Sequence, residues 1–269
     1  MNLPVHLLST DFDGTLIGHP SDGRCISEFG EILKSHKAAG GKWVINTGRS
    51  FIHTLEGMEH FQAPLEPDFL IALEREIYCR DEQGGWQEHM DWNNTCREQH
   101  QILFKEVKPL IDALCAYISD STDVTLISEG LQPVGLVTTS EEVMHRVVEV
   151  IERHGREYPN FAYQRNTIYL RFCHSAYHKG SALSEIGRML NISAQNILAA
   201  GDNYNDLGML DGKHAAMTAC PENAIPEVKQ MVKDSAGYIA SAKYAEGIAE
   251  AYRWFVSGKK TSPLMAGEA

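Results

Sequence analysis

The sequence predicts an α/β fold in which a core with a parallel sheet is interrupted by an inserted α+β domain. In residues 1–79 and again in residues 177–269, short apolar runs alternate with segments of helical period, which is typical of parallel strands with helices on the faces of the sheet. Between residues 80 and 176, apolar runs instead meet through tight turns, which is typical of antiparallel pairing. The predicted domains are therefore a discontinuous core, 1–79 with 177–269, and an insertion, 80–176.

The first part of the core is predicted as alternating strands and helices. Ser27 is a suitable N-cap for the first helix, and Gly40 and Gly41 end it. This β-α-β-α-β order is that of a Rossmann-like sheet. The predicted strands are Val5 to Thr10, Lys42 to Asn46 and Asp68 to Ala72, and the predicted helices are Ser27 to about Ala39 and about Ser50 to His60.

The insertion is predicted to contain strands and helices in a different rhythm. A long helix from Asn94 to Ile118 is expected to be interrupted at Pro109, and a second helix runs from Glu141 to His154. Gly130 and the pair Arg165-Asn166 are expected to be turns between strands. The predicted strands are Trp86 to Asp91, Asp123 to Ile127, Val134 to Thr138, Phe161 to Gln164 and Thr167 to Phe172.

The α/β rhythm resumes with a helix that opens at Lys179. Residues 258–269 show no periodicity, and we expect them to form a frayed tail. The predicted elements between are strands at Asn196 to Ala200, Ala215 to Ala219 and Gly237 to Ala240, and helices near Tyr204 to Leu210, Ile225 to Lys233 and Lys243 to Val256.

The composition excludes several classes of function. A net charge of -12 over 269 residues argues against a broad nucleic-acid surface, which needs clustered Lys and Arg. The six cysteines have no paired CxxC spacing, so neither a zinc site nor a disulfide framework is indicated. No segment reads as a signal peptide or a membrane span. We expect a cytoplasmic protein, a monomer or small homo-oligomer, with neither nucleic acid nor a membrane as partner.

Two carboxylates follow the first predicted strand. Asp11 and Asp13 stand one residue apart just after its apolar run, and Gly14 permits the sharp change of backbone direction that a loop requires. Both acids should therefore lie at the carboxyl end of a parallel strand, where α/β sheets bind their ligands. An acidic turn without function is the alternative, because Asp-Gly is a common turn dipeptide. Matching residues further along the chain decide between the two.

Three more polar clusters follow in order. Asn46-Thr47-Gly48-Arg49 follows the second predicted strand, Lys179 opens a helix, and Gly201 to Asp206 follows a later strand. Together with Asp11 and Asp13, these clusters resemble the four motifs of the haloacid dehalogenase superfamily. The long gap between the second and third clusters is similar to the branch with a large α+β cap, which includes Cof-type sugar phosphatases and sucrose-phosphate phosphatases. The resemblance covers nearly the whole chain and implies that the insertion is such a cap.

A phosphate monoester bound at these strand ends needs a nucleophile, neutralisation of its charge and a proton for the leaving oxygen. Asp11 is the candidate nucleophile, because a carboxylate can form an aspartyl-phosphate and divide one hard displacement into two easier ones. Asp13 is close enough in sequence to protonate the leaving oxygen and later to deprotonate the attacking water. The family assigns these roles to these two positions. The alternative for Asp13 is a turn former.

The second and third clusters are suited to hold the phosphate. Thr47 offers a hydroxyl, and Gly48 lets the backbone come close to a phosphoryl oxygen, with the amides of the following helix nearby. A cation at a helix N-terminus is unfavourable against the helix dipole unless an anion lies nearby, so we expect Lys179 to neutralise the phosphate and Asp11. A surface lysine is the alternative. By the resemblance, Asn205 contacts the phosphate or holds Lys179.

Asp202 and Asp206 raise the number of acids expected at this edge of the sheet to four. Carboxylates in one crevice repel each other unless a cation joins them, and Mg²⁺ prefers hard oxygen ligands and bridges them to phosphate. By the resemblance, the metal ligands are Asp11, the backbone carbonyl of Asp13 and Asp202, with Asp206 in or near the shell of residues around them. An acidic N-cap and first helical turn is the alternative for Asp202 and Asp206.

The cap of this branch supplies contacts to the leaving group. Glu76-Ile77-Tyr78 is similar to a stretch that follows the third strand in sucrose-phosphate phosphatases. The sequence departs from the family pattern at Leu73-Glu74-Arg75, which lacks the usual glycine, and at Thr218-Ala219-Cys220-Pro221, where a Met-Gly-Asn-Ala type of run is usual. The candidate contacts in the cap are Arg165, Asn166, Tyr169 and Arg171. The alternative is that alternation along the strands places half of them on a solvated face.

The sequence therefore predicts a Mg²⁺-dependent phosphatase that hydrolyses a small phosphorylated metabolite, a sugar phosphate above all, through an aspartyl-phosphate on Asp11. A phosphomutase of the phosphomannomutase type is an alternative, because it shares the motifs and the cap type. A signalling receiver domain, which also holds an aspartyl-phosphate with clustered aspartates, a lysine and Mg²⁺, is an alternative from another class. Receiver domains are much shorter and carry no inserted domain.

Overall fold

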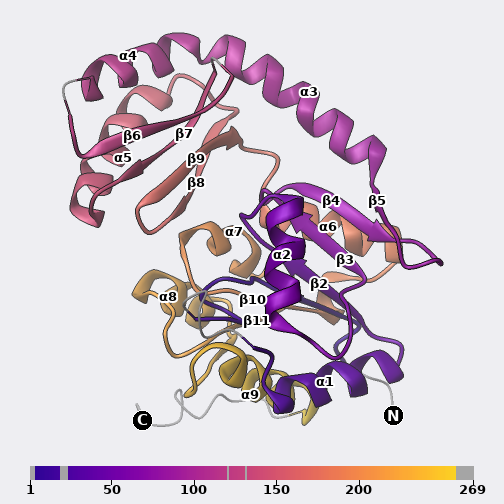
Figure 1. Cartoon of the computed structure of the whole chain (residues 1–269). Helices are drawn as coiled ribbons and strands as arrows, with labels where there is room; N and C mark the ends of the chain where they lie inside the picture. Colours follow the sequence, from indigo (N-terminus) through magenta and orange to yellow (C-terminus); the bar gives the residue numbers. More distant parts are fainter. Residues whose placement is uncertain (1–3, 19–23, 120, 131, 259–269) are drawn as a thin grey trace. The chain divides into compact units, whose positions relative to one another are not determined.

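The computed structural model describes residues 4–18, 24–119, 121–130 and 132–258 (Figure 1). The chain divides into two compact units, one formed by residues 1–89 with 179–269 and the other by residues 90–178. We refer to them as the core unit and the inserted unit. The inserted unit begins at residue 90, ten residues later than predicted, because residues Trp86–Glu88 form a strand at the edge of the core sheet.

Among the described residues, the core unit holds an eight-stranded sheet with the strand order β12-β11-β10-β1-β2-β3-β4-β5. Pairing is parallel from β12 to β3, and β4 and β5 are added antiparallel at one edge. The parallel part confirms the predicted α/β class. The strands are β1 (Leu7–Thr10), β2 (Lys42–Asn46), β3 (Phe69–Ala72), β4 (Glu76–Arg80), β5 (Trp86–Glu88), β10 (Ile197–Ala200), β11 (Met217–Cys220) and β12 (Tyr238–Ile239).

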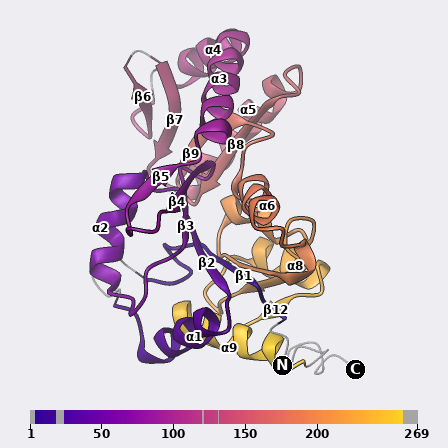
Figure 2. The same cartoon turned by 90° about the vertical axis from the view of Figure 1, so that its right-hand side faces the viewer.

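Helices cover both faces of this sheet. Figure 2 shows α2 on one side of the strands and α6 and α8 on the other. Ser50 caps α2, because its side chain accepts a hydrogen bond from the backbone N–H of His53. The predicted N-cap Ser27 is wrong by one residue, since Ile26 takes that position and Ser27 is already helical. The main helices are α1 (Ser27–Ala38), α2 (Phe51–Phe61), α6 (Lys179–Leu190), α7 (Leu207–Leu210), α8 (Pro226–Asp234) and α9 (Tyr244–Val256).

The centre of the sheet is buried on both faces. Every residue of β1 and β10 is buried, as expected for parallel strands between two helical layers. On one face the ring of Phe29 lies 6.1 Å from that of Trp43 and 6.4 Å from that of Phe61. These packed aromatic rings hold the central strands in place and thereby fix the positions of the strand ends.

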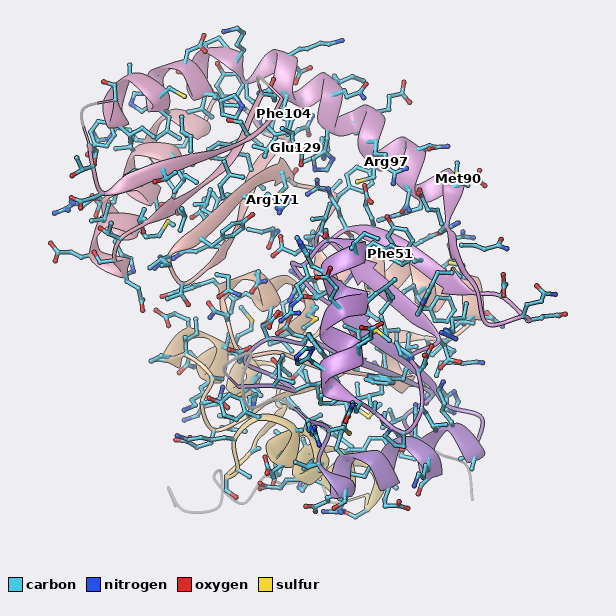
Figure 3. All side chains as sticks on the ribbon, in the orientation of Figure 1. Phe51, Met90, Arg97, Phe104, Glu129 and Arg171 are labelled. Atoms are coloured by element: carbon cyan, nitrogen blue, oxygen red, sulfur yellow. The ribbon has the colours of Figure 1, made fainter. Side chains whose placement is uncertain are left out.

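The edge of the core sheet differs from the prediction. The strand expected at Trp86 to Asp91 ends at Glu88, and it pairs with β4 in the core sheet through Arg80 and Trp86 rather than belonging to the insertion. Strand β4 was not predicted as a strand at all. It is held there by packing, since Phe51 of α2 (labelled in Figure 3) stacks on Tyr78 with ring centroids 4.2 Å apart.

The inserted unit combines an antiparallel sheet with helices, as predicted. Its described residues form a four-stranded sheet with the order β6-β7-β9-β8. Buried side chains of the helices, among them Leu114 and Met144, pack with Leu136, Leu170 and Phe172 of the sheet in a separate hydrophobic core. The elements are α3 (Met90–Glu106), α4 (Lys108–Ile118), β6 (Val124–Glu129), β7 (Gln132–Thr138), α5 (Glu141–Gly155), β8 (Phe161–Asn166) and β9 (Tyr169–His174).

Two details of the inserted unit are instructive. The expected interruption of the long helix is confirmed, because α3 and α4 are separated at Val107 and Pro109 lies in the first turn of α4. The expected turn at Arg165-Asn166 is wrong. Both residues belong to β8, and the chain turns at Thr167, which adopts a φ of 52°.

Part of the predicted organisation falls outside the described residues. This holds for residues 19–23 of the loop after the first strand and for residues 259–269 of the predicted tail. No helix in the described ranges has the length and apolar character needed to cross a membrane.

Candidate active site

The predicted motifs converge at the carboxyl ends of the central strands of the core unit. Thr10 of β1 is paired with Ala200 of β10, and the N–H of Asp11 donates to the carbonyl of Ala200 at 2.9 Å. Asp11 is the first residue beyond β1, and Asp202 is the second beyond β10. Two acids that are distant in sequence are thereby brought to one edge of the sheet.

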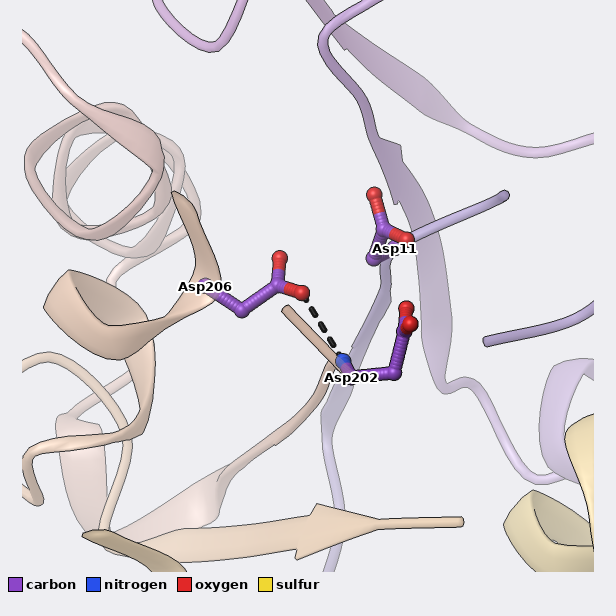
Figure 4. A group of neighbouring side chains, drawn as sticks. All are labelled: Asp11, Asp202 and Asp206. Atoms are coloured by element: carbon purple, nitrogen blue, oxygen red, sulfur yellow. Dashed lines mark hydrogen bonds between the residues drawn. The ribbon is translucent and has the colours of Figure 1, made fainter. Parts of the chain in front are cut away.

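Three aspartates form a cluster there. Asp11, Asp202 and Asp206 each offer a carboxylate oxygen, and these oxygens all lie within 4.8 Å of one another (Figure 4). All three side chains are buried, with Asp206 fully enclosed. Buried carboxylates at this separation repel each other unless positive charge is placed among them.

Lys179 supplies one positive charge. It is the first residue of α6, and its Nζ donates to Asp11 Oδ1 at 2.5 Å and to Asp206 Oδ1 at 2.6 Å. The side chain is fully buried. Burial alone would lower the pKa of Lys179, but the charges of Asp11 and Asp206 outweigh that effect and raise it. The alternative of a surface lysine is therefore wrong.

Asp206 braces the loop that follows β10. Its Oδ2 accepts the backbone N–H groups of Asp202 and Asn203 at 2.8 and 2.9 Å, while its Oδ1 accepts from Lys179. Both oxygens are thus engaged by the protein. The geometry leaves Asp11 and Asp202 as the members of the cluster with oxygen atoms available to a cation.

Negative charge exceeds positive charge in this cluster. Burial raises the pKa of Asp11 well above its ordinary range, and Lys179 offsets only part of this effect. Burial, followed by the charge of Asp206, raises the pKa of Asp202 to about 7. A divalent cation would relieve this repulsion, and the carboxylate oxygens present are the ligands that Mg²⁺ prefers. The residues therefore fit the predicted metal.

The loop after β1 closes against Asp202, and Gly14 makes this possible, as expected from the sequence. Gly14 has a φ of 84°, and a Cβ atom there would lie only 2.3 Å from Asp202 Oδ2, so no larger residue fits. Thr15 Oγ1 donates to Asp202 Oδ1 at 2.8 Å. Asn223 Nδ2 donates to the carbonyl of Gly14 at 2.7 Å. These contacts fix the position of Asp202 relative to Asp11.

Asp13 is held apart from the cluster by Arg49. Arg49 Nε donates to Asp13 Oδ2 at 2.7 Å and its Nη2 donates to Oδ1 at 2.5 Å, so both carboxylate oxygens are occupied. The side chain of Asp13 remains 36% exposed, unlike the buried acids. For Asp13 to exchange a proton with a bound molecule, one of these two bonds must open. No local pattern indicates this pairing, which joins residues 36 positions apart.

The predicted phosphate-binding residues lie around a second buried acid. Thr47 is buried at the end of β2, and its Oγ1 accepts the N–H of Arg49 at 3.1 Å. Asn205 Nδ2 donates at 2.8 Å to Glu74 Oε1, an atom that also lies next to Gly48. Glu74 had been noted only for the missing glycine of its segment. Its buried position beside Asn205 makes it a further residue of the site.

The cap residues named from the sequence contact partners inside the inserted unit. Arg165 is buried and its Nε donates to the carbonyl of Thr167 at 3.0 Å. Arg171, labelled on β9 in Figure 3, donates through Nη2 to the hydroxyl of Tyr169 at 2.9 Å. Alternation along the strand thus places Tyr169 and Arg171 on the same face.

Comparison with known proteins identifies relatives along the whole chain. A protein of Streptococcus pyogenes with a provisional phosphatase name is 22% identical over 94% of this chain and 99% of its own length. The structure of the sucrose-phosphatase of Synechocystis, solved in complex with sucrose and phosphate, superposes with a TM-score of 0.70 at 21% identity, covering 94% of this chain and 98% of that one. A sugar phosphatase of subclass IIB of the haloacid dehalogenase superfamily superposes with a TM-score of 0.64 at 19% identity, covering 93% and 99%.

Family profiles assign the chain. The profile of sucrose-6F-phosphate phosphohydrolases matches residues 4–111, and that of the haloacid dehalogenase-like hydrolases matches residues 66–251. The predicted class of enzyme, a phosphoric monoester hydrolase, agrees with the names of these relatives. The resemblance expected from the four motifs is confirmed, and the chain belongs to the haloacid dehalogenase-like hydrolases.

Proposed function

We propose that this protein is a Mg²⁺-dependent phosphatase that hydrolyses a small phosphorylated metabolite, of the sugar phosphate class, through an aspartyl-phosphate on Asp11. One observation carries the proposal. The Asp11 carboxylate lies 2.5 Å from the fully buried Lys179 ammonium, inside a cluster of carboxylates that has more negative charge than the protein neutralises. Such a cluster is costly to bury, and phosphoryl transfer is the chemistry that uses it.

In this proposal, Mg²⁺ is held by Asp11, the backbone carbonyl of Asp13 and Asp202. When bound, the ion neutralises phosphoryl oxygens and the carboxylates together. Asp206 is not a ligand, because both of its oxygens are bonded to Lys179 and to backbone N–H groups. Its part is to fix the Asp202 loop and to orient the Lys179 ammonium.

The side chains of the core unit divide the reaction between them. Lys179, Thr47, the backbone at Gly48 and Asn205 hold the phosphoryl oxygens, while Asp11 attacks phosphorus and forms the phosphoenzyme. Asp13 leaves Arg49 and takes up a proton from solvent, gives that proton to the leaving oxygen, and takes one back from the water that hydrolyses the aspartyl-phosphate. The nucleophile is thus buried, whereas the acid-base group is accessible.

The substrate class rests on the relatives. One profile matched by this chain is that of sucrose-6F-phosphate phosphohydrolases, and one similar structure contains sucrose and phosphate. A second similar structure is a sugar phosphatase. These names support a phosphorylated sugar as the substrate here.

The test is release of phosphate from p-nitrophenyl phosphate by the purified protein, with Mg²⁺ and with EDTA. We expect turnover that requires the metal and that is lost in Asp11→Asn. Asp112→Asn serves as the matched control, because Asp112 is an exposed acid of α4 that forms a surface ion pair with Lys108. Turnover that persists in EDTA or in Asp11→Asn would overturn the proposal. A sugar phosphate returned as an isomer with little free phosphate would instead indicate the phosphomutase reaction.

A further inference from the structure

The turn after β3 has an unusual backbone. Leu73 and Glu74 both adopt left-handed conformations, with φ of 49° and 65°, although neither is glycine. Two hydrogen bonds fasten this turn to the Thr47 loop, because the N–H of Leu73 donates to Arg49 O at 2.8 Å and that of Glu74 to Thr47 O at 2.9 Å. Such a conformation persists only when the surroundings impose it, and it directs the Glu74 side chain into the protein.

The Glu74 carboxylate is buried beside the proposed phosphate pocket. The residue is only 5% exposed, and Oε1 accepts from Asn205 Nδ2 at 2.8 Å. Its other oxygen, Oε2, is buried and makes no hydrogen bond to any described residue. Buried carboxylate oxygens are normally bonded, because desolvating an unbonded one is costly. Hydrogen bonds from the described residues therefore engage only one of the two oxygens of this carboxylate, and the other faces its surroundings without one.

Those surroundings are the groups proposed to bind phosphate. A Cβ atom at Gly48 would lie 3.2 Å from Glu74 Oε1, so glycine leaves the room that this carboxylate occupies. Although burial lowers the pKa of Lys179, the charge of Glu74 acts with those of Asp11 and Asp206 to raise it. Glu74 and the two aspartates thus all interact with the positive charge of Lys179. Glu74 also lies next to the Asn205 amide and the Gly48 backbone, the groups proposed to bind phosphate.

We propose that Glu74 is a positioning residue of the phosphate pocket. Its carboxylate fixes the Asn205 amide, and its negative charge limits the affinity for inorganic phosphate so that the product leaves. This inference rests on the proposed function. A carboxylate near the pocket repels the phosphate dianion, and release of product limits turnover in many enzymes. The hydrogen bond to Asn205 prevents the amide from turning away while the pocket is empty.

Three variants separate the effects of the Glu74 charge, of its hydrogen bond to Asn205 and of the left-handed backbone of the turn. Glu74→Gln removes the charge but keeps an oxygen that accepts from Asn205. Glu74→Gly removes both and suits the left-handed backbone. Leu73→Gly is the matched control, because it relaxes the same turn without touching the carboxylate. Thermal melting of each variant confirms that it is folded, and Glu74→Gly still removes the charge if Glu74→Gln does not fold.

The readouts are binding of inorganic phosphate by calorimetry in Mg²⁺ buffer and steady-state turnover of p-nitrophenyl phosphate. Glu74→Gln should bind phosphate about tenfold more tightly and lower KM and kcat together, since product release slows. In Glu74→Gly, kcat/KM should fall about tenfold below that of Glu74→Gln, because Asn205 loses its partner. Leu73→Gly should stay within about twofold of the wild type in both measurements.

The outcomes distinguish this inference from the proposed function. If the wild type binds phosphate and hydrolyses the ester while Glu74→Gln binds phosphate no more tightly, the role of Glu74 is wrong and the proposed function stands. If Leu73→Gly reproduces the changes seen in the Glu74 variants, the backbone and not the carboxylate is responsible. If the wild type neither binds phosphate nor hydrolyses the ester, the proposed function fails and the role of Glu74 fails with it.

Discussion

The core unit and the inserted unit bury different kinds of polar group. Among the described residues, every buried carboxylate belongs to the core unit: Asp11, Glu74, Glu76, Asp202 and Asp206. The buried polar side chains of the inserted unit are Asn93, His100, Thr138, Arg165 and His174.

Local hydrogen bonds engage the two buried histidines of the inserted unit. The N–H of His174 donates to His100 Nε2 at 3.1 Å, and His100 Nδ1 lies 2.8 Å from the carbonyl of Cys96. In the core unit, by contrast, Asp11 and Asp202 keep oxygens that the protein does not fully use, and one lysine faces several acids. Charge buried beyond what local bonding needs is the feature on which we base the proposal that the core unit performs the chemistry.

Replacement of Lys179 tests this contrast with the largest expected effect. Lys179→Met should lower the free energy of unfolding by about 3–5 kcal/mol at pH 7 without metal, because it leaves buried carboxylates uncompensated. It should also abolish turnover. Lys108→Met, which breaks an exposed pair with Asp112 in the inserted unit, should leave stability unchanged. Equal denaturation midpoints for the two variants would remove the distinction between the units.

Replacement of Asp13 tests whether this partly exposed acid of the proposed site takes part in the chemistry. Asp13→Asn should lower kcat for p-nitrophenyl phosphate about 10²–10⁴-fold, since proton transfer to the leaving oxygen is lost. Its thermal midpoint should remain close to that of the wild type, because Asp13 is partly exposed. Arg49→Ala provides the comparison, as it frees the carboxylate without removing it. Retention of full activity in Asp13→Asn would exclude it as the acid-base group.

The pH dependence of stability tests the excess of negative charge. Asp202 has a pKa of about 7 in the folded protein against an ordinary value of 3.8, owing first to burial and then to Asp206. The contribution of this group is therefore fully present below pH 4 and is lost as the pH rises through 7, on the order of a few kcal/mol. If Mg²⁺ binds the ionised form, as we propose, it should cancel this loss.

The measurement is chemical denaturation from pH 4 to pH 7.5 with and without Mg²⁺. The difference between the two series should grow as the pH rises, and other titrating groups such as His36 cancel in the difference. Asp202→Asn is the control and should show a smaller dependence of the difference on pH, because only Asp11 remains as a ligand with a raised pKa. A stabilisation by Mg²⁺ that does not depend on pH would contradict this explanation.

The smallest effect on turnover is expected from a substitution in the inserted unit. His100→Leu removes the acceptor of the His174 N–H and should cost about 1–3 kcal/mol of stability. Turnover of p-nitrophenyl phosphate by the folded variant should be unchanged, because this bond lies within the inserted unit. A fall in kcat comparable to that of Asp13→Asn would show that the inserted unit takes part in the chemistry itself.

The sequence predicted the site where position along a strand determines it. Asp11 and Asp202 each follow an apolar run of the strand type, so the pattern places both at the carboxyl edge of the sheet. Their assignment to one site came from the resemblance of the four motifs, and the direct pairing of β1 with β10 is seen only in the structure. Lys179 was also predicted, because a cation at a helix start requires an anion. In each case, local chemistry and topology point to the same place.

The residues that were missed depend on contacts without a local signal. The pairing of Arg49 with Asp13 joins two loops, and neither residue type indicates the other. The hairpin from β3 to β4 turns at Leu73 and Glu74, which lack the glycine or asparagine by which such turns are recognised. Strand β4 and the buried Glu74 escaped prediction for this reason. Tertiary packing, not propensity, imposes that turn.

The most direct test of the central claim is to trap the phosphoenzyme. Wild-type protein is mixed with a phosphorylated substrate and Mg²⁺, quenched in acid within milliseconds and digested, and the phosphorylated peptide is identified by mass spectrometry. We expect the phosphoryl group on Asp11, none in Asp11→Asn, and a longer-lived adduct in Asp13→Asn. Rapid turnover with no adduct on Asp11, or with the phosphoryl group on another residue, would contradict the assignment of the core cluster as the catalytic site.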